Sequence, residues 1–293
     1  MSGRLPTATV VVPAYNAERT IDECVRSLLD LRYPEGALEL IVVDNGSSDA
    51  TAGRLRTYGD RVRVMQASRR GPSAARNAGL RGAEGEVVAF TDADCRVEPD
   101  WLARLAEPLE RDEVAIAGGR ILARRPANDV ELFGEVIHDH RQAIEVFDPP
   151  YAITMSWASR RATLRELGGF DESVRRGEDV DLSYRAIQAG YQIAFVESAV
   201  VYHRNESSLA GLFREGFLHG VGGVRTRKRH ERFLHELGHR GAVNGRAYAE
   251  IGRRALDWAR GRDAERARCE TAFNSGKRAG QLLGSLRFRH LDL

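Results

Sequence analysis

The sequence predicts an α/β fold with a mainly parallel β-sheet flanked by helices. Short apolar runs typical of strands alternate with helix-like segments through the first two thirds of the chain, the order that produces parallel strands with right-handed crossovers. Three of these runs end in polar loops, at residues 14–16, 44–45 and 92–94. Ligands bind such sheets outside the carboxyl ends of the strands. We therefore expect the three loops to share one edge of the sheet.

The expected strands are rich in β-branched residues, as buried strands of parallel sheets are. They lie at residues 7–13, 38–44, 62–65, 87–90, 114–118, 153–157, 193–196 and 200–203. Helices are expected at residues 18–31, after 49, at 73–80, within 130–144, around 165–167 and from about 178 to Gly190. Ile21, Val25 and Leu28 show the helical spacing of apolar residues that supports the first of these helices.

Length and charge divide the chain into two parts. A chain of 293 residues can form one large α/β domain plus an appendage, at roughly 150 residues per domain. We expect the α/β domain at residues 1–205 and a basic helical C-terminal extension at residues 206–293. Residues 204–293 hold 19 of the 44 Lys and Arg but 10 of the 42 Asp and Glu. The basic run 225–232 is by default a solvated helix face, and binding to phosphates or anionic lipid stays open.

The sequence gives weaker indications of the compartment. No run approaches the ~18 apolar residues that span a bilayer, and the N-terminus lacks a signal segment. Cys24, Cys95 and Cys269 show neither a disulfide pattern nor metal-site spacing. We expect a cytoplasmic protein, either free or peripheral at the inner face of the membrane. No nucleic-acid partner is expected, and a homo-oligomer stays open.

Asp92 and Asp94 follow the apolar run at residues 87–90. Residues two apart in an extended segment project to the same side, so both carboxylates can face one ligand. Oxygen donors suit Mg²⁺ or Mn²⁺, ions that commonly bridge to substrate phosphates. The alternative is that both residues cap a turn before the helix that begins near Pro99.

Six segments occur in an order that resembles the family 2 glycosyltransferases. They are residues 10–16 (VVVPAYN), 42–49 (VVDNGSSD), 75–79 (ARNAG), 92–94 (DAD), 168–172 (GGFDE) and 177–182 (GEDVDL). The resemblance covers about residues 7–205 and implies the GT-A fold. It also implies a metal-dependent, inverting transfer of a sugar from a nucleotide diphosphate sugar, a UDP-sugar in the first instance, to an acceptor hydroxyl. The acceptor would be a glycan, a lipid-linked molecule or a small molecule.

The resemblance implies a role for each donor-site residue. Ala14 and Tyr15 would contact the base and ribose, Asp44 would accept a hydrogen bond from the base, Arg76 would lie near the base or phosphates, Asp92 would hold the ribose or act through metal-bound water, and Asp94 would ligate Mg²⁺ or Mn²⁺. The bound cation would stabilise the departing pyrophosphate as a Lewis acid. Alternatively, Asp44 caps a turn and Tyr15 is an ordinary half-exposed aromatic.

By the same resemblance, Asp179 is the candidate catalytic base. In an inverting transfer the acceptor hydroxyl attacks opposite the leaving group, and a carboxylate must take its proton. The neighbouring Glu178 would bind the acceptor. Alternatively, these acids complement the dipole of a helix that begins here. Asp181 and Arg185 stand four residues apart, so we expect a local ion pair between them.

His203 and Trp157 each have two interpretations. His203 ends a strand, and the resemblance implies that it ligates the metal or contacts the diphosphate, whereas an isolated histidine at such a place is more often structural. Trp157 would either form a platform for the acceptor or belong to the core, the commoner place for a tryptophan.

Two other functions compete with glycosyl transfer. A nucleotidyltransferase can share the sheet and the metal, but residues 13–16 lack the glycine-rich signature usual after the first strand of those enzymes. A non-catalytic nucleotide-sugar-binding protein is the second alternative, and the combination of Asp94 with Asp179 disfavours it.

Overall fold

The computed structural model describes residues 5–174, 176–239 and 245–290. The chain forms two compact units. The first contains the residues up to Arg124 together with His138–Arg204, and the second contains Arg125–Ile137 together with the residues from Asn205 onward. Residues 125–137, which the sequence-based division leaves with the α/β domain, thus belong to the C-terminal unit.

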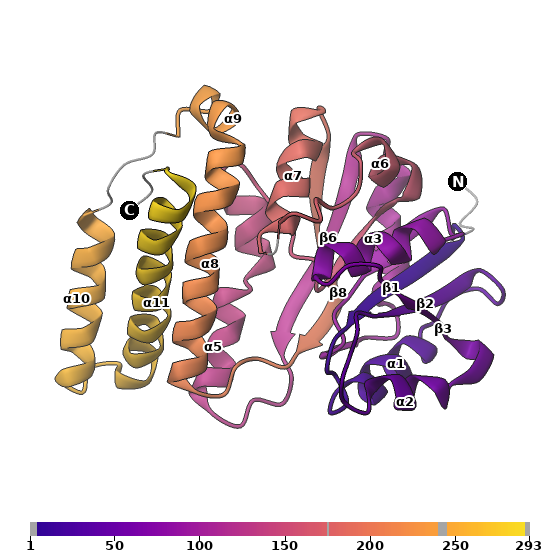
Figure 1. Ribbon diagram of the computed structural model, residues 1–293, viewed down its shortest axis with the longest axis horizontal. Coiled ribbons are helices and arrows are strands. Elements are labelled where there is room, and N and C mark those ends of the chain that lie inside the picture. The colour runs from indigo at the N-terminus through magenta and orange to yellow at the C-terminus, as the bar shows by residue number, and fades with distance from the viewer. Residues whose placement is uncertain (1–4, 175, 240–244, 291–293) are drawn as a thin grey trace. The chain divides into compact units, whose positions relative to one another are not determined.

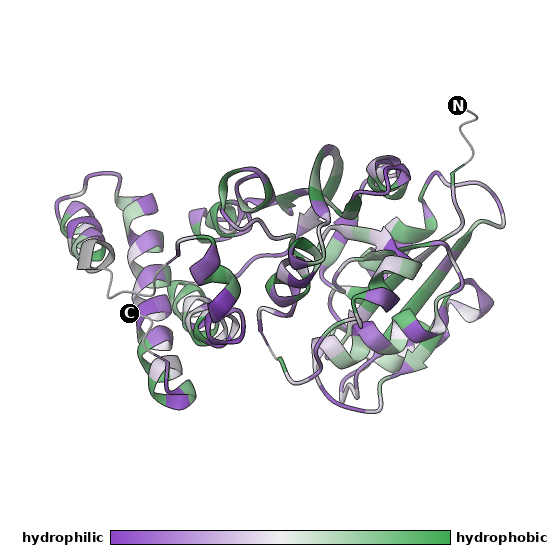
Figure 2. Cartoon of the chain, turned by 90° about the horizontal axis from the view of Figure 1, so that it is seen from above, coloured by the Kyte–Doolittle hydropathy of each residue, from purple (hydrophilic) through white to green (hydrophobic). Residues whose placement is uncertain are grey.

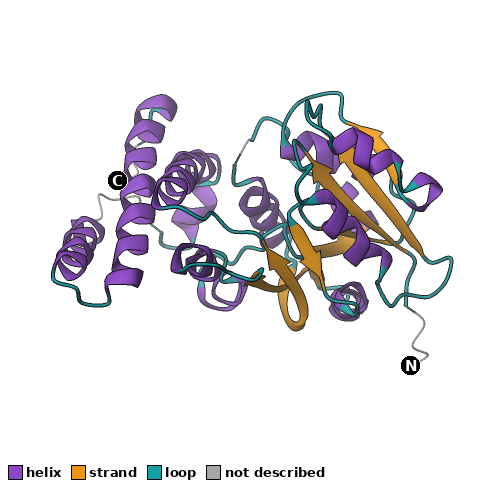
Figure 3. Ribbon diagram, turned by 90° about the horizontal axis from the view of Figure 1, so that it is seen from below, coloured by secondary structure: helices purple, strands orange, loops and turns teal. Residues whose placement is uncertain are grey.

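An eight-stranded mixed sheet forms the centre of the first unit (Figure 1; orange in Figure 3). Its order is β3-β2-β1-β4-β7-β6-β8-β5. The strands are β1 (Ala8–Ala14), β2 (Leu38–Asp44), β3 (Arg63–Gln66), β4 (Val87–Phe90), β5 (Cys95–Val97), β6 (Val114–Ala123), β7 (Trp157–Arg160) and β8 (Gln192–His203). Strands β3, β2, β1 and β4 are parallel, whereas β7 runs antiparallel to both β4 and β6. The first half of the sheet is therefore the parallel sheet that the sequence predicts.

The second half of the sheet corrects three expected strands. Residues 153–156 form a turn in which Ser156 N donates to Ile153 O at 3.2 Å, and β7 begins only at Trp157. The two strands expected at 193–196 and 200–203 are one strand, β8, whose pairing with β6 is irregular between Gly119 and Arg120. Strand β5 was not expected, because three residues are too few to give a pattern.

Helices cover both faces of this sheet. One core cluster packs β1 residues Val10 and Val12 against α1 (Ile21–Leu29) and α4 (Trp101–Ala106). A second cluster packs Val11 against the helices on the other face of the sheet, which are α3 (Pro72–Gly82), α6 (Arg161–Glu166) and α7 (Glu178–Gln188). Successive strand residues point to opposite faces, so the unbroken apolar strands serve both clusters. The short elements are α2 (Thr51–Arg56), η1 (Gly59–Arg61), η2 (Glu107–Glu110) and η3 (Gln142–Val146). In Figure 2 the central strands of this unit are largely hydrophobic.

The second unit is helical. Its elements are α5 (Asp129–Ile137), α8 (Leu209–Arg229), α9 (Glu231–Glu236), α10 (Gly245–Ala259) and α11 (Ala264–Phe288). Of the helices in the described residues, none is long and apolar enough to cross a membrane. The helix expected within 130–144 ends at Ile137 as α5.

Glycines bring α8 and α11 into close contact. A Cβ atom added at Gly216 or Gly220 would lie 2.1 Å from a backbone oxygen of α11, and one at Gly276 or Gly280 would lie 2.0 Å from a backbone oxygen of α8. Gly216 meets Phe273, and Gly220 meets the next turn of α11, so the two helices run parallel. Their C-terminal ends therefore lie together.

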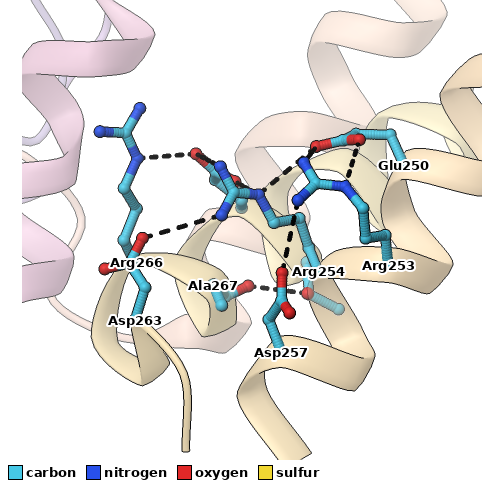
Figure 4. Close-up of polar contacts among 9 residues, drawn as sticks. Glu250, Arg253, Arg254, Asp257, Asp263, Arg266 and Ala267 are labelled. Carbon is cyan, nitrogen blue, oxygen red and sulfur yellow. Dashed lines mark hydrogen bonds and ion pairs between the residues drawn. The ribbon is translucent and has the colours of Figure 1, made fainter.

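Ion pairs join α10 to α11 (Figure 4). The Arg254 guanidinium contacts Glu250 on its own helix at 3.4 Å and Asp263 before α11 at 3.7 Å, and it also pairs with Glu270. Arg266 Nε donates to Glu270 at 2.8 Å. These partly exposed pairs link α10 to the beginning of α11.

Candidate active site

The loops after β1 and β2 are tied together at one edge of the sheet. Ala14 lies opposite Asp44 in the register of the two strands, and Asn45 N donates to Ala14 O at 2.8 Å. The buried Asp44 carboxylate accepts a hydrogen bond from Ser47 N at 3.1 Å. Asp44 thus does cap its turn with one oxygen, which is compatible with a ligand role for the other.

Tyr15 projects from this edge. Its side chain is 54% exposed, and the Arg70 guanidinium lies 5.8 Å from the ring centroid. The next residue, Asn16, has a φ of 49°, and its Oδ1 accepts from Ser48 N at 2.9 Å. This turn holds an aromatic face in solvent, where a flat ring can stack on it.

Arg76 lies at the centre of a buried ion-pair network. It is 3% exposed, and its Nη1 donates to Glu178 Oε1 at 2.7 Å while Nη2 donates to Asp92 Oδ1 at 2.8 Å. Burial by itself would lower the pKa of Arg76, but the carboxylates of Asp92 and Glu178 outweigh that effect and raise the pKa. Arg76 therefore stays charged, and each terminal nitrogen donates to a carboxylate inside the protein.

Asn77, the next residue of α3, links the same helix to a later segment. Its Nδ2 donates to Phe170 O at 2.8 Å, and its Oδ1 accepts from Phe170 N at 2.9 Å. Gly169 precedes this contact with a φ of +68°, a conformation suited to glycine. The 75–79 and 168–172 segments thus belong to one framework that supports the site.

Asp94 and His203 meet at the end of the β5–β8 pair. Cys95 lies opposite His203 in the register, and His203 Nε2 is 3.5 Å from Asp94 Oδ2. Burial would raise the pKa of Asp94, but the charge of His203 and its hydrogen bond hold that pKa below its ordinary value. The His138 ring packs edge-on against His203 with centroids 5.2 Å apart. Sequence reasoning missed His138, because it lies in an irregular segment without a motif.

The Asp94 and His203 side chains fit a shared divalent cation. Two ligand atoms of one ion, each roughly 2.1 Å from it, lie about 3 Å apart. The separation of 3.5 Å between Asp94 Oδ2 and His203 Nε2 is close to that value. A carboxylate oxygen with an imidazole nitrogen suits Mn²⁺ better than Mg²⁺.

Asp179 lies in the first turn of α7. Its half-buried carboxylate accepts from Val180 N at 2.9 Å. Burial, followed by the negative charge of Glu178, raises the pKa of Asp179 to about 7. Burial and then Asp179 also raise the pKa of Tyr151, so this tyrosine is a further neighbour that sequence reasoning missed.

Two other sequence predictions have clear outcomes. Asp181 and Arg185 form the expected ion pair, with Nη2 to Oδ2 at 2.8 Å. Trp157 is completely buried, with its ring 5.4 Å from Phe90 and 5.7 Å from Phe170. Trp157 therefore presents no face to an acceptor, and the core interpretation is the correct one.

Comparison with known proteins identifies the family. The family model described as glycosyl transferase family 2 matches residues 9–168, more than half of the chain. The chain belongs to glycosyltransferase family 2. This membership excludes the first alternative to glycosyl transfer, which is a nucleotidyltransferase.

Several known proteins are similar to this chain in sequence. Glycosyltransferase AglE of Haloferax volcanii is 28% identical over 208 residues, which cover 69% of this chain and 68% of that protein. The succinoglycan biosynthesis protein ExoO of Rhizobium meliloti is 32% identical over 72% of this chain and 64% of its own length. The pre-mycofactocin glycosyltransferase of Mycobacterium tuberculosis is 30% identical over 69% of this chain, but the match spans only 43% of that relative.

Solved structures share the GT-A-like fold. A mannosyltransferase from Pyrobaculum calidifontis, in complex with GDP-Man and Mn²⁺, aligns with a TM-score of 0.67 at 21% identity and covers 96% of this chain and 87% of its own. S. aureus TarS 1-349 in complex with UDP-GlcNAc aligns with a TM-score of 0.55 at 17% identity, over 97% of this chain and 92% of its own. At these identities the likeness concerns the fold.

Proposed function

We propose that this family 2 glycosyltransferase performs a metal-dependent, inverting sugar transfer from a nucleotide diphosphate sugar to an acceptor hydroxyl. The observation that carries the proposal is the Arg76 bridge. It connects Asp92, after β4, with Glu178, at the start of α7, through hydrogen bonds of 2.8 and 2.7 Å. Asp92 adjoins the candidate metal ligand Asp94, and Glu178 adjoins the candidate base. The bridge supports a single site that contains both groups.

The donor would bind along the edge formed by β1, β2 and β4. The exposed Tyr15 ring would stack on the base, Ala14 would contact the base or ribose, and Asp44 would accept a hydrogen bond from the base. Asp92 is partly exposed beside Arg76 and would hold the ribose. A UDP-sugar is the first donor to test, and a GDP-sugar is the second, because structural neighbours were solved with each nucleotide class.

Asp94 and His203 would hold the divalent cation. When bound, the cation supplies Lewis-acid stabilisation of the negative charge on the departing pyrophosphate. The donor set favours Mn²⁺, and Mg²⁺ remains the alternative to test.

Asp179 would take the proton of the acceptor hydroxyl. The acceptor oxygen forms a bond to the anomeric carbon as the bond from that carbon to the phosphate oxygen breaks, and the nucleotide diphosphate leaves from the opposite face. The proton passes to the Asp179 carboxylate. A base with a pKa near the working pH is well matched to this step, and the pKa of Asp179 is raised to about 7.

Glu178 and Arg76 receive revised roles in this proposal. Glu178 is buried against Arg76, so we assign it to positioning the start of α7 rather than to contacting the acceptor. Arg76 likewise positions Asp92 and Glu178 rather than contacting phosphates. The acceptor is a glycan, a lipid-linked molecule or a small molecule.

Thermal-shift measurements with UDP and GDP, each with Mn²⁺, with Mg²⁺ or with EDTA, test donor binding. A ligand present at 100 times its Kd stabilises the folded state by about 2.7 kcal/mol. We expect one nucleotide to raise the Tm with Mn²⁺ and to lose most of that effect with EDTA. Asp94→Ala should abolish the metal-dependent part, whereas Asp100→Ala, on the exposed Arg32 pair, should retain it. Equal shifts with Mn²⁺ and EDTA would reject the metal dependence.

A further inference from the structure

Three leucines near the end of α11 are exposed to solvent. Leu282 and Leu283 are each 47% exposed, and Leu286 is 80% exposed. Their spacing places them on one side of the helix, whereas Gly280 and Gly284 face α8. A single exposed leucine needs no explanation, but adjacent ones on one helix face indicate an interaction surface.

Basic residues lie at the same end of the α8–α11 pair as these leucines. Because α8 and α11 run parallel, the basic end of α8 lies beside the last turn of α11. Lys228 Nζ donates to Phe288 O, and the Arg225 guanidinium is 5.8 Å from the Phe288 ring centroid. Segments 225–229 and 282–290 together contain Arg225, Arg227, Lys228, Arg229, Arg287 and Arg289, and neither segment contains Asp or Glu.

One acidic residue stands two positions after each of these segments in the sequence. Glu231 comes after the first, with Oε1 3.9 Å from His290 Nδ1, and Asp292 comes after the second, outside the described residues. Residues 225–232 and 282–292 together hold seven Lys and Arg but two acidic residues, a net charge of +5. We call the three leucines and the six basic residues the α8–α11 patch.

We propose that the α8–α11 patch docks on the surface of an anionic lipid bilayer. Clusters of 4–8 Lys and Arg bind anionic headgroups, at about 1 kcal/mol for each residue near the surface. Leucines beside such a cluster enter the boundary between headgroups and acyl chains. A nucleic acid would match the charge but would leave the leucines in water, and an apolar protein partner would not need the cations. An anionic bilayer offers headgroups to the basic residues and an apolar boundary to the leucines.

Vesicle flotation with the full chain tests this proposal. One set of vesicles contains only phosphatidylcholine, and the other contains roughly one third phosphatidylglycerol. We expect binding to the anionic vesicles to be at least about tenfold tighter, and to weaken as NaCl screens the charges. Equal binding to both sets, or no binding to the anionic set, would overturn the proposal.

Variants separate the apolar and basic halves of the patch. The Leu282→Ser, Leu286→Ser double variant and the Arg227→Gln, Arg229→Gln double variant should each weaken binding to anionic vesicles by about tenfold. Melting curves followed by circular dichroism verify that each variant is folded. If folded patch variants bind as tightly as the wild type, the patch is not the docking surface.

Matched control variants lie outside the patch. Leu256→Ser removes an equally exposed leucine of α10, and Arg32→Gln with Arg104→Gln removes two exposed arginines of the first unit. Both controls should bind anionic vesicles like the wild type.

Sedimentation velocity tests the rival occupant, a second copy of the chain. A wild-type dimer that the leucine variant converts to a monomer, without vesicle binding by either, would overturn the lipid proposal.

Discussion

Arg76 Nη1 donates a 2.7 Å hydrogen bond to Oε1 of Glu178, a residue 102 positions further along the chain. The same guanidinium bonds Asp92 at 2.8 Å, so one buried cation fixes the distance between the end of β4 and the start of α7. Arginine suits this role because its planar group offers several donors in a fixed geometry. The proposed donor and base halves of the site thus depend on one side chain.

Arg76→Met should strongly destabilise the first unit. It would leave Glu178 and Asp92 without their shared cation, and breaking a buried ion pair costs about 3–5 kcal/mol. Calorimetric or denaturant unfolding measures the loss. Arg81→Met, on the same helix, removes the exposed pair with Glu172 and should cost about 0–1 kcal/mol. Similar losses in both variants would contradict the proposed importance of the bridge.

The rate of transfer should rise with pH up to about 7 and then level off. The pKa of Asp179 is raised to about 7, and the acceptor proton can be taken only by the deprotonated carboxylate. Below that pH, kcat should fall about tenfold per unit. Glu178→Gln removes the negative neighbour that helps to raise this pKa, so the inflection should move to lower pH. If the inflection stays at the same pH in Glu178→Gln, the inflection does not report the pKa of Asp179.

Gly280→Ala should destabilise the C-terminal unit by about 2 kcal/mol or more, because a Cβ there would lie 2.0 Å from the backbone oxygen of Phe217. Gly223→Ala is the control in α8. Nothing lies within 4 Å of its added Cβ, and the substitution should stabilise the helix by about 0.5–1 kcal/mol. Scanning calorimetry compares the two variants. Equal effects would mean that α8 and α11 are not in backbone contact.

The predictions from the sequence were most accurate for the strands that are buried on both faces of the sheet. Strands β1, β2 and β4 are mainly apolar runs followed by polar loops, and all three form where the sequence predicts them. The strand expected at 153–157 failed for a physical reason. Ile153, Met155 and Trp157 alternate with polar residues as a strand does, but a turn at residues 153–156 buries Met155 and delays β7.

The site was predictable in its residue types but not in its pairings. The motifs indicated Arg76, Asp92, Glu178 and Asp179, yet nothing local says that Arg76 is buried between two of the others. Contacts between residues about a hundred positions apart depend on the packing of α3 against α7, which no sequence spacing reveals. Sequence reasoning missed His138, which lies in a segment without a motif, and it left Trp157 between an acceptor platform and the core.

Asp179→Asn gives the most direct test of glycosyl transfer by this site. The amide keeps the size of the side chain but cannot take the acceptor proton. The measurement compares the rate of nucleotide diphosphate release in the presence of acceptor with donor affinity, for the wild type and for the variant. We predict a loss of transfer of at least about 10²-fold with donor affinity nearly unchanged. Wild-type turnover in the folded variant would contradict the role of Asp179 as the base.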